Sequence, residues 1–320
     1  MEQQNKNNKF RIGVDLGGTN IKVGIVDINN NIIQTHSCDT LSNRSWQEVV
    51  DDIIKTVKIT VDKSNITIED CISCGIGCPG TINASNGVVI YSNNLKWENV
   101  PLGEYLSNAL NLPVKVSNDA NCAALGECVA GVAKEYKSAV LLTLGTGVGG
   151  GVVYDGKIFE GGAGGMELGH ISLVDEGDEC TCGRRGCIES YCSATALIRQ
   201  SLKCIEIHSD TLMVKLMQEN NNKMNAKIPF DAAKLNDKYA LNLVNRYIEW
   251  LGKSIVNMIN IFRPEVVLLS GGICAEGEYL TIPLTKYANK YSYAAGLVDK
   301  IPVKIAMLGN TAGILGAASL

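Results

Sequence analysis

The sequence contains no uninterrupted apolar run of membrane-spanning length, and it opens on the polar residues MEQQNKNNKF rather than on an apolar signal segment. A helix that crosses a membrane needs about 20 consecutive apolar residues, so these features predict a cytoplasmic protein with no membrane partner. In such a compartment, the 12 cysteines are more typical of metal ligands or free thiols than of disulfides.

The sequence also lacks an excess of positive charge. It has 29 Lys and Arg against 33 Asp and Glu, for a net charge of -4, and its basic residues are scattered rather than clustered. Binding to nucleic acid needs a concentrated basic surface. The composition therefore predicts no nucleic-acid partner.

What is present is enough chain for two ordinary domains and a substantial core. The sequence has 320 residues, of which 46% are hydrophobic. Its 33 glycines are concentrated at a few turns, a pattern that favours close approach of the backbone to phosphate groups.

The segment from Glu167 to Glu189 has the ligand pattern of a metal site. It reads C-x-C-G-x-x-G-C with a histidine upstream, so one imidazole and three thiolates are available from His170, Cys180, Cys182 and Cys187. This set is typical of a closed structural Zn²⁺ site, and thiolates favour zinc over magnesium or calcium. The alternative is a chance cluster of small buried hydrophobes. Glu167 and Glu189 bracket the cluster, and we hypothesise that they accept hydrogen bonds from a polyhydroxylated ligand.

Two glycine-threonine turns, each between alternating apolar strands, are predicted about 128 positions apart. In the first, a strand ends at Asp15, and the amides of Gly17, Gly18 and Thr19 can face an anion before the chain returns. Asp15 is placed to hold Mg²⁺ through water. The second turn contains Thr146 and Gly147. A plain hairpin is the alternative for one such turn, but the duplication predicts two related α/β halves that bind one nucleotide.

Further elements follow from local signals. A capping box at Ser45–Glu48 predicts a helix from about 46 to the low sixties, and 71–78 reads as a buried strand that ends in a turn at Pro79 and Gly80. The region 220–227 reads as an exposed loop. We also expect helices at 120–131, 194–204, 237–262 and 310–320, and strands at 114–117, 138–144, 151–153, 265–270 and 303–306.

Four residues near these elements are candidate ligand contacts. Asn94 is a candidate sugar contact or a surface turn residue. Asp119 stands at a strand-to-helix junction, where a helix N-cap and a catalytic group are both compatible with the sequence. Gly271 and Gly272 follow a strand and would let adenine and ribose approach the backbone.

With these residues assembled, the chain resembles the ROK family of sugar kinases and repressors, over nearly its whole length. The shared motifs are DLGGTNIK at 15–22, GCPG at 77–80, NDANCAALGE at 118–127, LGTGVGGG at 144–151, and ELGH with CTCGRRGC within 167–187. The resemblance implies an α/β fold of two actin-like, ribonuclease H-like ATPase domains with a cleft between them, and a structural zinc loop in the second. The predicted domains are 1–117 with 307–320, and 118–306 with the zinc loop and dimerisation helices.

The resemblance also implies roles for single residues. Asp119 would be the catalytic base, and zinc would be held as described above. The sugar would contact Gly80, Asn94, Asn118, Asp119, Glu167, His170 and Glu189. The nucleotide and its metal would contact Asp15, Gly17, Gly18, Thr19, Asn20, Lys22, Thr146, Gly147, Gly271 and Gly272. Two positions depart from the family pattern: Ser117 stands where many of its bacterial glucokinases carry glutamate, and Met166 stands where they often carry glycine.

The function expected from this resemblance is ATP-dependent phosphorylation of a hexose at its 6-hydroxyl, with glucose as the first choice of substrate. The cofactors would be ATP, Mg²⁺ and structural Zn²⁺, and the expected assembly is a homodimer. Alternative substrates are N-acetylmannosamine, N-acetylglucosamine, fructose and allose. A sugar-sensing transcriptional regulator is a further alternative, which the short segment of about nine residues before the first strand disfavours, because it has no room for a helix-turn-helix.

Overall fold

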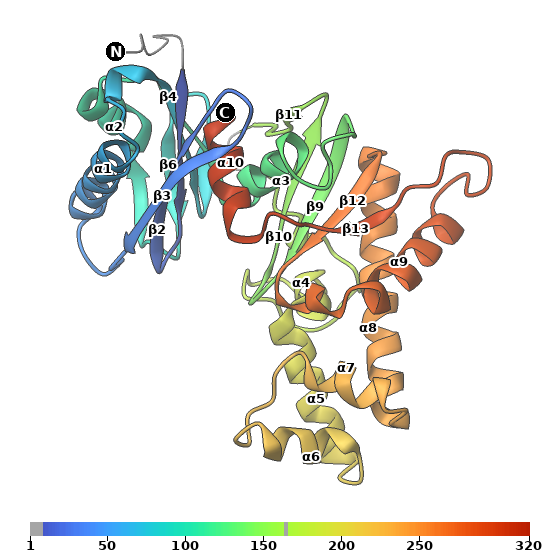
Figure 1. Ribbon diagram of the computed structural model, residues 1–320. Helices are drawn as coiled ribbons and strands as arrows, with labels where there is room; N and C mark the ends of the chain where they lie inside the picture. Colours follow the sequence, from blue (N-terminus) through green and yellow to red (C-terminus); the bar gives the residue numbers. More distant parts are fainter. Residues whose placement is uncertain (1–8, 163–165) are drawn as a thin grey trace. The chain divides into compact units, whose positions relative to one another are not determined.

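The computed structural model describes residues 9–162 and 166–320 (Figure 1). Within them, the chain forms two compact units. Of the described residues, the first unit comprises 9–139, 151–162, 166 and 307–320, and the second comprises Val140–Gly150 and Glu167–Ala306. These units are defined by compactness, so the functional domain boundaries given above stay a prediction.

The first unit is built on a five-stranded sheet in the order β3-β2-β1-β4-β8. The strands are β1 (Phe10–Leu16), β2 (Asn20–Val26), β3 (Ile32–Asp39), β4 (Cys71–Cys78) and β8 (Val114–Asn118). β2 runs antiparallel to β1 and β3, whereas β1, β4 and β8 are parallel. The carboxyl ends of the parallel strands therefore meet at one edge of the sheet, the usual place for ligands in such folds.

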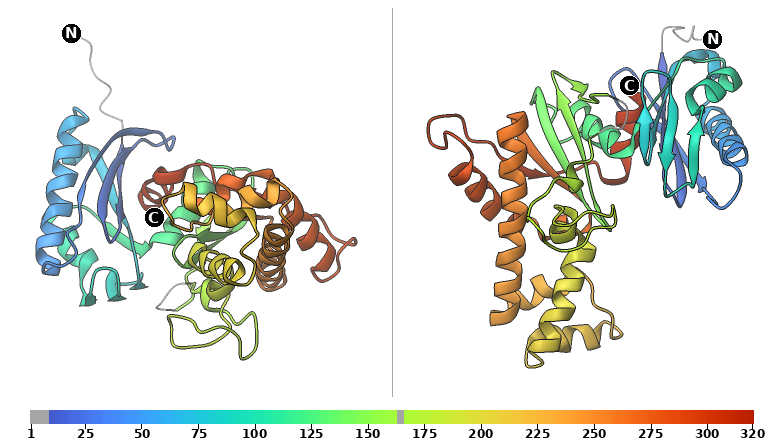
Figure 2. Two further views of the ribbon diagram at one scale, coloured as in Figure 1. Left: turned by 90° about the horizontal axis from the view of Figure 1, so that it is seen from below. Right: turned by 180° about the vertical axis from the view of Figure 1, so that it is seen from behind.

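Helices cover both faces of this sheet (Figure 2). α1 (Trp46–Lys63) packs on β2 and β3, and the predicted capping box at its start is confirmed, since Ser45 and Glu48 bond reciprocally. Its apolar face joins a core that also includes side chains of α2 (Leu102–Leu110). On the other face, α10 (Ala312–Ala318) packs on β1, β4 and α3 (Asp119–Val129), so the last helix returns to the first unit as predicted.

A small antiparallel sheet in the first unit was not predicted. It consists of β5 (Thr81–Asn83), β6 (Val88–Ser92) and β7 (Trp97–Val100). Each strand has only three to five residues, too few for alternation to stand out from a polar, turn-rich sequence. The turn between β6 and β7 carries Asn94.

A second five-stranded sheet repeats the topology of the first, in the order β11-β10-β9-β12-β13. Its strands are β9 (Ser138–Leu144), β10 (Val148–Tyr154), β11 (Lys157–Ile158), β12 (Val266–Ser270) and β13 (Val303–Ile305). Here, as in the first sheet, three consecutive strands lie in sequential order and a later strand pairs with the first of them. The duplication predicted from the two glycine-threonine turns is confirmed at the level of topology.

β11 and residues 151–154 of β10 fall in the first compact unit. Outside the strands that it contains, the second unit is mainly helical. Its helices are α4 (Glu189–Cys192), α5 (Ala194–Ile207), α6 (Leu212–Glu219), α7 (Ile228–Lys234), α8 (Lys238–Phe262) and α9 (Glu278–Tyr291). α8 begins after the N-cap Asp237 and ends at Arg263, which adopts a left-handed conformation before Pro264. Short 3-10 helices occur at Ile68–Asp70, Leu168–His170, Gly272–Glu276 and Gly309–Thr311.

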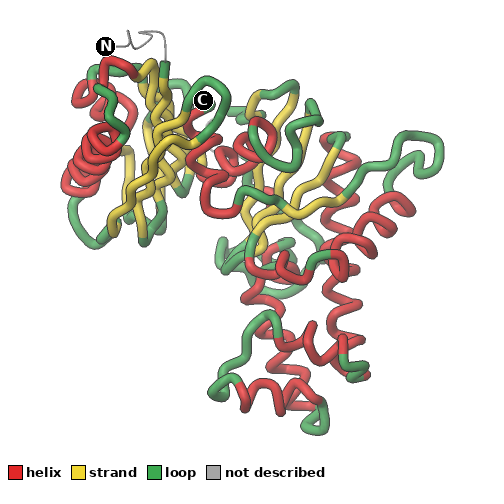
Figure 3. Tube along the Cα trace, viewed as in Figure 1, coloured by secondary structure: helices red, strands yellow, loops and turns green. Residues whose placement is uncertain are grey.

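Loops occupy the places that the sequence indicated. The predicted loop at 220–227 connects α6 to α7 (Figure 3), and most of the cysteine-rich segment between Leu168–His170 and α4 lacks regular structure. Within residues 9–162 and 166–320, no helix combines the length and apolar character needed to cross a membrane.

Candidate active site

Hydrogen bonds to Gly17 and Thr19, the two neighbours of Gly18, fix the first glycine-threonine turn. The amide of Gly17 donates to the carbonyl of Asn20 (2.9 Å), and Thr40 donates from its hydroxyl to the carbonyl of Gly17 (2.7 Å) and from its amide to the carbonyl of Thr19 (2.8 Å). The Gly17 amide is therefore used within the turn, contrary to the expectation that it faces an anion. In the described part of the chain, no acceptor takes the amides of Gly18 and Thr19, so these two donors remain for a ligand.

Asp15 lies at the end of β1, beside this turn. Its carboxylate is 3.7 Å from the ammonium group of Lys22, which also donates to the side chain of Asn310 (3.4 Å). Burial raises the pKa of Asp15, and the charge and hydrogen bond of Lys22 only partly offset this effect. Lys22 thus offsets part of the cost of burying this carboxylate.

The carboxyl end of β8 brings together three predicted site residues. Asn118 caps α3, since its side-chain oxygen accepts the amides of Ala120 (2.9 Å) and Asn121 (3.3 Å), while its side-chain nitrogen donates to the carbonyl of Gly80 (3.1 Å). The N-cap role therefore belongs to Asn118. Asp119 is the first residue of the helix and is half-buried.

The carboxylate of Asp119 lies in a mixed environment. One of its oxygens accepts the amide of Ala120 (2.9 Å). Burial and then the charge of Asp119 raise the pKa of Cys78 and Cys122 well above the ordinary thiol value. These cysteines are therefore neutral, buried packing residues in the neighbourhood of Asp119.

Two contacts at this edge add to the predicted site. The buried hydroxyl of Ser117 donates to the carboxylate of Glu160 (2.6 Å), a residue that local sequence signals do not single out because the partners are 43 positions apart. Asn94 is exposed, and a β-carbon placed on Gly18 would lie 3.3 Å from that of Asn94. The β6–β7 turn therefore packs against the first glycine-threonine turn, which local patterns could not predict.

In the second unit, the four predicted zinc ligands converge. The donor atoms of His170, Cys180, Cys182 and Cys187 all lie within 4.8 Å of one another. The sulfur of Cys180 is 3.5 Å from Nδ1 of His170, and the sulfurs of Cys182 and Cys187 are 3.7 Å apart. With Zn–S bonds of about 2.3 Å and Zn–N bonds of about 2.0 Å, a tetrahedron places sulfur about 3.5 Å from nitrogen and about 3.8 Å from sulfur. The residues therefore fit a tetrahedral zinc ion.

Glu189 connects this cluster to the second glycine-threonine turn. One carboxylate oxygen accepts the amide of Val148 (2.9 Å), and the other accepts the hydroxyl of Thr181 (3.0 Å) and lies 3.7 Å from the sulfur of Cys180. A β-carbon on Gly147 would lie only 2.2 Å from the first oxygen, so this contact requires glycine. The sequence predicted Glu189 as a sugar contact, and its link to the turn was missed.

The second turn has a further glycine beside it. The amide of Gly145 donates to the carbonyl of Gly147 (3.0 Å), and the amide of Gly149 donates to the hydroxyl of Thr143 (3.1 Å). Gly271 has a φ of 104°, and a β-carbon there would lie 2.2 Å from the carbonyl oxygen of Leu144. Gly271 therefore allows close packing against β9, whereas a β-carbon built on Gly272 would have no atom near it. The candidate nucleotide residues Thr146, Gly147, Gly271 and Gly272 thus cluster at the ends of β9 and β12.

Glu167 is the remaining predicted sugar contact. It is exposed and immediately precedes Leu168–His170, and its carbonyl accepts the amide of His170 (3.0 Å). Glu167 and the predicted metal ligand His170 are therefore fixed relative to each other by one turn of 3-10 helix.

Comparison with known proteins identifies the relatives of this arrangement. A glucokinase from Thermotoga maritima is 39% identical over 311 residues, which are 97% of this chain and 96% of that protein. A xylose repressor from Caldicellulosiruptor bescii is 28% identical and matches 99% of this chain and 79% of its own length.

The fold of a solved relative agrees with the prediction of an actin-like α/β protein. The crystal structure of a ROK family glucokinase from Streptomyces griseus, in complex with glucose and AMPPNP, has a TM-score of 0.77 and 30% identity, and covers 97% of this chain and 98% of its own. The family model for ROK matches residues 11–320. The chain belongs to the ROK family.

Proposed function

We propose that this protein is an ATP-dependent hexose kinase that transfers the γ-phosphoryl group to the 6-hydroxyl of glucose. The observation that carries the proposal is the full-length similarity to a glucokinase, in a chain whose predicted acid, glycine turns and metal ligands are all structured. As a kinase of free sugars, it would act in the cytoplasm.

Asp119 is the proposed general base. Its carboxylate would accept the proton of the 6-hydroxyl as that oxygen attacks the γ-phosphorus in line. Asn118 caps the helix that carries Asp119 and bonds Gly80, so these neighbours would hold the carboxylate in a fixed position and contact the sugar, together with Asn94.

In the second unit, Glu167, His170 and Glu189 are the proposed sugar contacts. With Nδ1 of His170 directed at Cys180, its other ring nitrogen would carry the proton and donate to a sugar hydroxyl. Glu189 already accepts two hydrogen bonds, but a carboxylate has about four lone-pair sites. One residue can therefore serve both the turn and the sugar.

The nucleotide phosphates would meet fixed amide donors. In the first turn, these donors are the amides of Gly18 and Thr19, and Asn20 and Lys22 lie beside them. In the second turn, the donors are the backbone amides near Thr146 and Gly147. Preorganised donors stabilise charge that develops on phosphate oxygens because they need no reorientation during the reaction. Mg²⁺ would neutralise phosphate charge, with Asp15 positioned to hold its water ligands. Gly271 and Gly272 would border the adenosine.

Zinc would be held by His170, Cys180, Cys182 and Cys187, with a structural role. All four positions of a tetrahedron are then filled by protein, which leaves none for substrate. Its contribution would be to fix His170 and the segment that presents Glu167 and Glu189.

The test of this function is ADP release by the purified protein with ATP, Mg²⁺ and a panel of hexoses. Glucose should give the highest kcat/KM. Higher kcat/KM for N-acetylmannosamine, N-acetylglucosamine, fructose or allose would keep the reaction class and replace the substrate.

A sugar-responsive regulator is the second candidate, since a repressor aligns with nearly all of this chain. The two functions separate on turnover, because a regulator needs to bind sugar but not to consume ATP. Saturable sugar binding without ADP release for any sugar in the panel would favour the regulator.

A further inference from the structure

We infer that Thr40 is a positioning residue for nucleotide binding, and that Arg44 and Asp52 hold it in place. The inference rests on the proposed function, in which the first glycine-threonine turn meets the phosphates of ATP. Thr40 itself lies behind the turn and would not touch the nucleotide.

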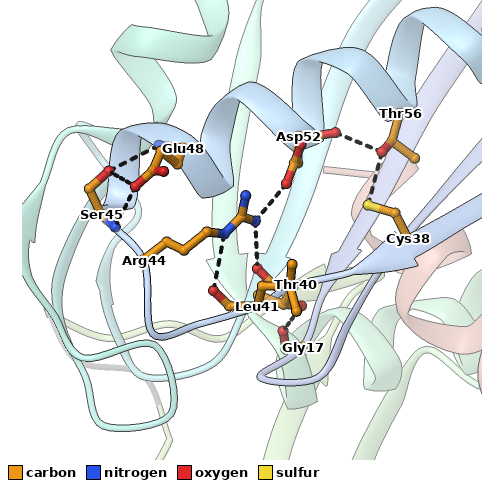
Figure 4. Close-up of polar contacts among 9 residues, drawn as sticks. All are labelled: Gly17, Cys38, Thr40, Leu41, Arg44, Ser45, Glu48, Asp52 and Thr56. Carbon is orange, nitrogen blue, oxygen red and sulfur yellow. Dashed lines mark hydrogen bonds and ion pairs between the residues drawn. The ribbon is translucent and has the colours of Figure 1, made fainter.

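Thr40 fixes the turn through its backbone carbonyls. It is fully buried, and its hydroxyl donates to the carbonyl of Gly17 (Figure 4). Its amide donates to the carbonyl of Thr19, so the two bonds end on the residues that flank Gly18. The carbonyl of Gly17 and the amide of Gly18 belong to one planar trans peptide and point in opposite directions. When Thr40 holds this carbonyl, it directs the Gly18 amide to the opposite side of the turn, where an anion can bind.

Arg44 ties Thr40 to the start of α1. Its guanidinium donates to the carbonyls of Thr40 (3.1 Å) and Leu41 (3.3 Å) and pairs with the carboxylate of Asp52 (2.6 Å) (Figure 4). Leu41 has a φ of 47°, a left-handed conformation that is unusual for leucine. Arg44 therefore stabilises a strained link between β3 and α1, and this strain is retained beside a predicted ligand site.

The start of α1, which follows this link, is fixed by its own cap. Ser45 and Glu48 form the capping box, and Asp52 lies on the next turn of the helix. The chain of contacts thus runs from capped helix to Asp52, Arg44, Thr40 and the phosphate turn. All of these residues lie in the first unit.

The decisive experiment compares Thr40→Val, which removes the hydroxyl, with Thr40→Ser, which keeps it. Isothermal titration would measure Kd for Mg²⁺–AMPPNP and for glucose separately. One lost hydrogen bond and a freed carbonyl should raise the nucleotide Kd of Thr40→Val by about 5- to 30-fold. The glucose Kd should stay unchanged, and Thr40→Ser should bind nucleotide like the wild type.

Thr60→Val is the matched control. Thr60 is also fully buried, and its hydroxyl donates to the backbone carbonyl of Thr56 (2.6 Å) within α1. The same chemical change there should lower the melting temperature without changing the nucleotide Kd. A Thr40→Val protein with wild-type nucleotide affinity, or with equal losses for nucleotide and glucose, would overturn the inference.

Arg44→Met provides a second route if Thr40→Val does not fold. Arg44 is partly exposed, so the variant should fold, and its nucleotide Kd should rise by about 2- to 5-fold because the clamp is loosened rather than removed. Lys253→Met, which breaks the exposed pair with Glu249 on α8 (2.8 Å), is its control. An unchanged Kd in Arg44→Met would count against the inference.

Wild-type protein that binds no nucleotide would overturn both the inference and the proposed function. Normal kinase activity, together with an unchanged nucleotide Kd in Thr40→Val, would overturn the inference alone.

Discussion

Asn118 and Asp119 are adjacent residues with separate structural assignments at the start of α3. Because Asn118 supplies the N-cap of α3, the cap itself does not require the Asp119 carboxylate, one oxygen of which accepts the amide of Ala120. A change at Asp119 should therefore affect chemistry more than folding.

Asp119→Asn should keep sugar binding and lower kcat by about 10²- to 10⁴-fold, the usual contribution of a general base. The neutral amide has the same shape but cannot accept the hydroxyl proton. Steady-state kinetics and glucose titration would measure the two effects. Wild-type kcat in this variant would remove Asp119 from the mechanism.

The zinc ligands offer a second test at the residue scale. Cys182→Ser should lose bound zinc and lower the melting temperature, since serine is a poor ligand for zinc and the loop lacks other regular structure. Elemental analysis and thermal unfolding would measure both. Cys204→Ser on α5, outside the cluster, is the control and should retain zinc. Full metal content in Cys182→Ser would refute its role as a ligand.

At the scale of the helices and strands, the N-cap Asp237 of α8 can be tested through the pH dependence of stability. Asp237 accepts the amides of Tyr239 and Ala240 at the start of α8, and the amide of Leu212 and hydroxyl of Thr211 at the start of α6. Burial alone would raise the pKa of Asp237, but these hydrogen bonds outweigh it and lower the pKa below its ordinary value of 3.8.

A lowered folded-state pKa means that the Asp237 contribution is present above pH 3.8 and is lost as pH falls through the folded-state value. Asp237→Ala should cost about 0.5–2 kcal/mol of unfolding free energy at pH 7, and the gap to wild type should narrow in acid. Denaturant unfolding at several pH values would measure it. Asp237→Asn keeps the cap, so its stability should lack this titration; a gap for Asp237→Ala that is constant down to low pH would contradict the account.

Element prediction succeeded where the signal was local. The capping box marked the start of α1, and the helix predicted at 237–262 matches α8. The strands β5, β6 and β7 were missed because they are short and are stabilised by pairing with each other rather than by a pattern of their own. α6, α7 and α9 were missed for a related reason, since their packing partners lie elsewhere in the second unit.

The sequence predicts those parts of the site that lie within one short motif. It does not predict the contacts between segments that are distant in the sequence. The four predicted zinc ligands lie within 18 positions, so their spacing alone indicated that they converge. Three hydrogen bonds at the site join distant residues. The partners are 43 positions apart for Ser117 and Glu160, 41 for Glu189 and Val148, and 23 for Thr40 and Gly17. Such pairs depend on the folded arrangement of strands, which a pattern of residue types does not encode locally.

At the scale of the whole molecule, duplication explains why one chain has two glycine-threonine turns. Both sheets share one strand order, and each turn joins the first two strands of its sheet. Each turn is also tied to a neighbouring segment, the first by Thr40 and the second by Glu189. The two halves thus use one topology with different residues to fix the same kind of turn.

The central claim is that this chain moves a phosphoryl group from ATP to the 6-oxygen of a hexose. Incubation of the wild-type protein with glucose, Mg²⁺ and ATP labelled at the γ-phosphate, followed by NMR of the product, tests it most directly. The expected product is glucose 6-phosphate that carries the label, formed in a one-to-one ratio with ADP. Label found only in free phosphate, or at another oxygen of the sugar, would contradict it.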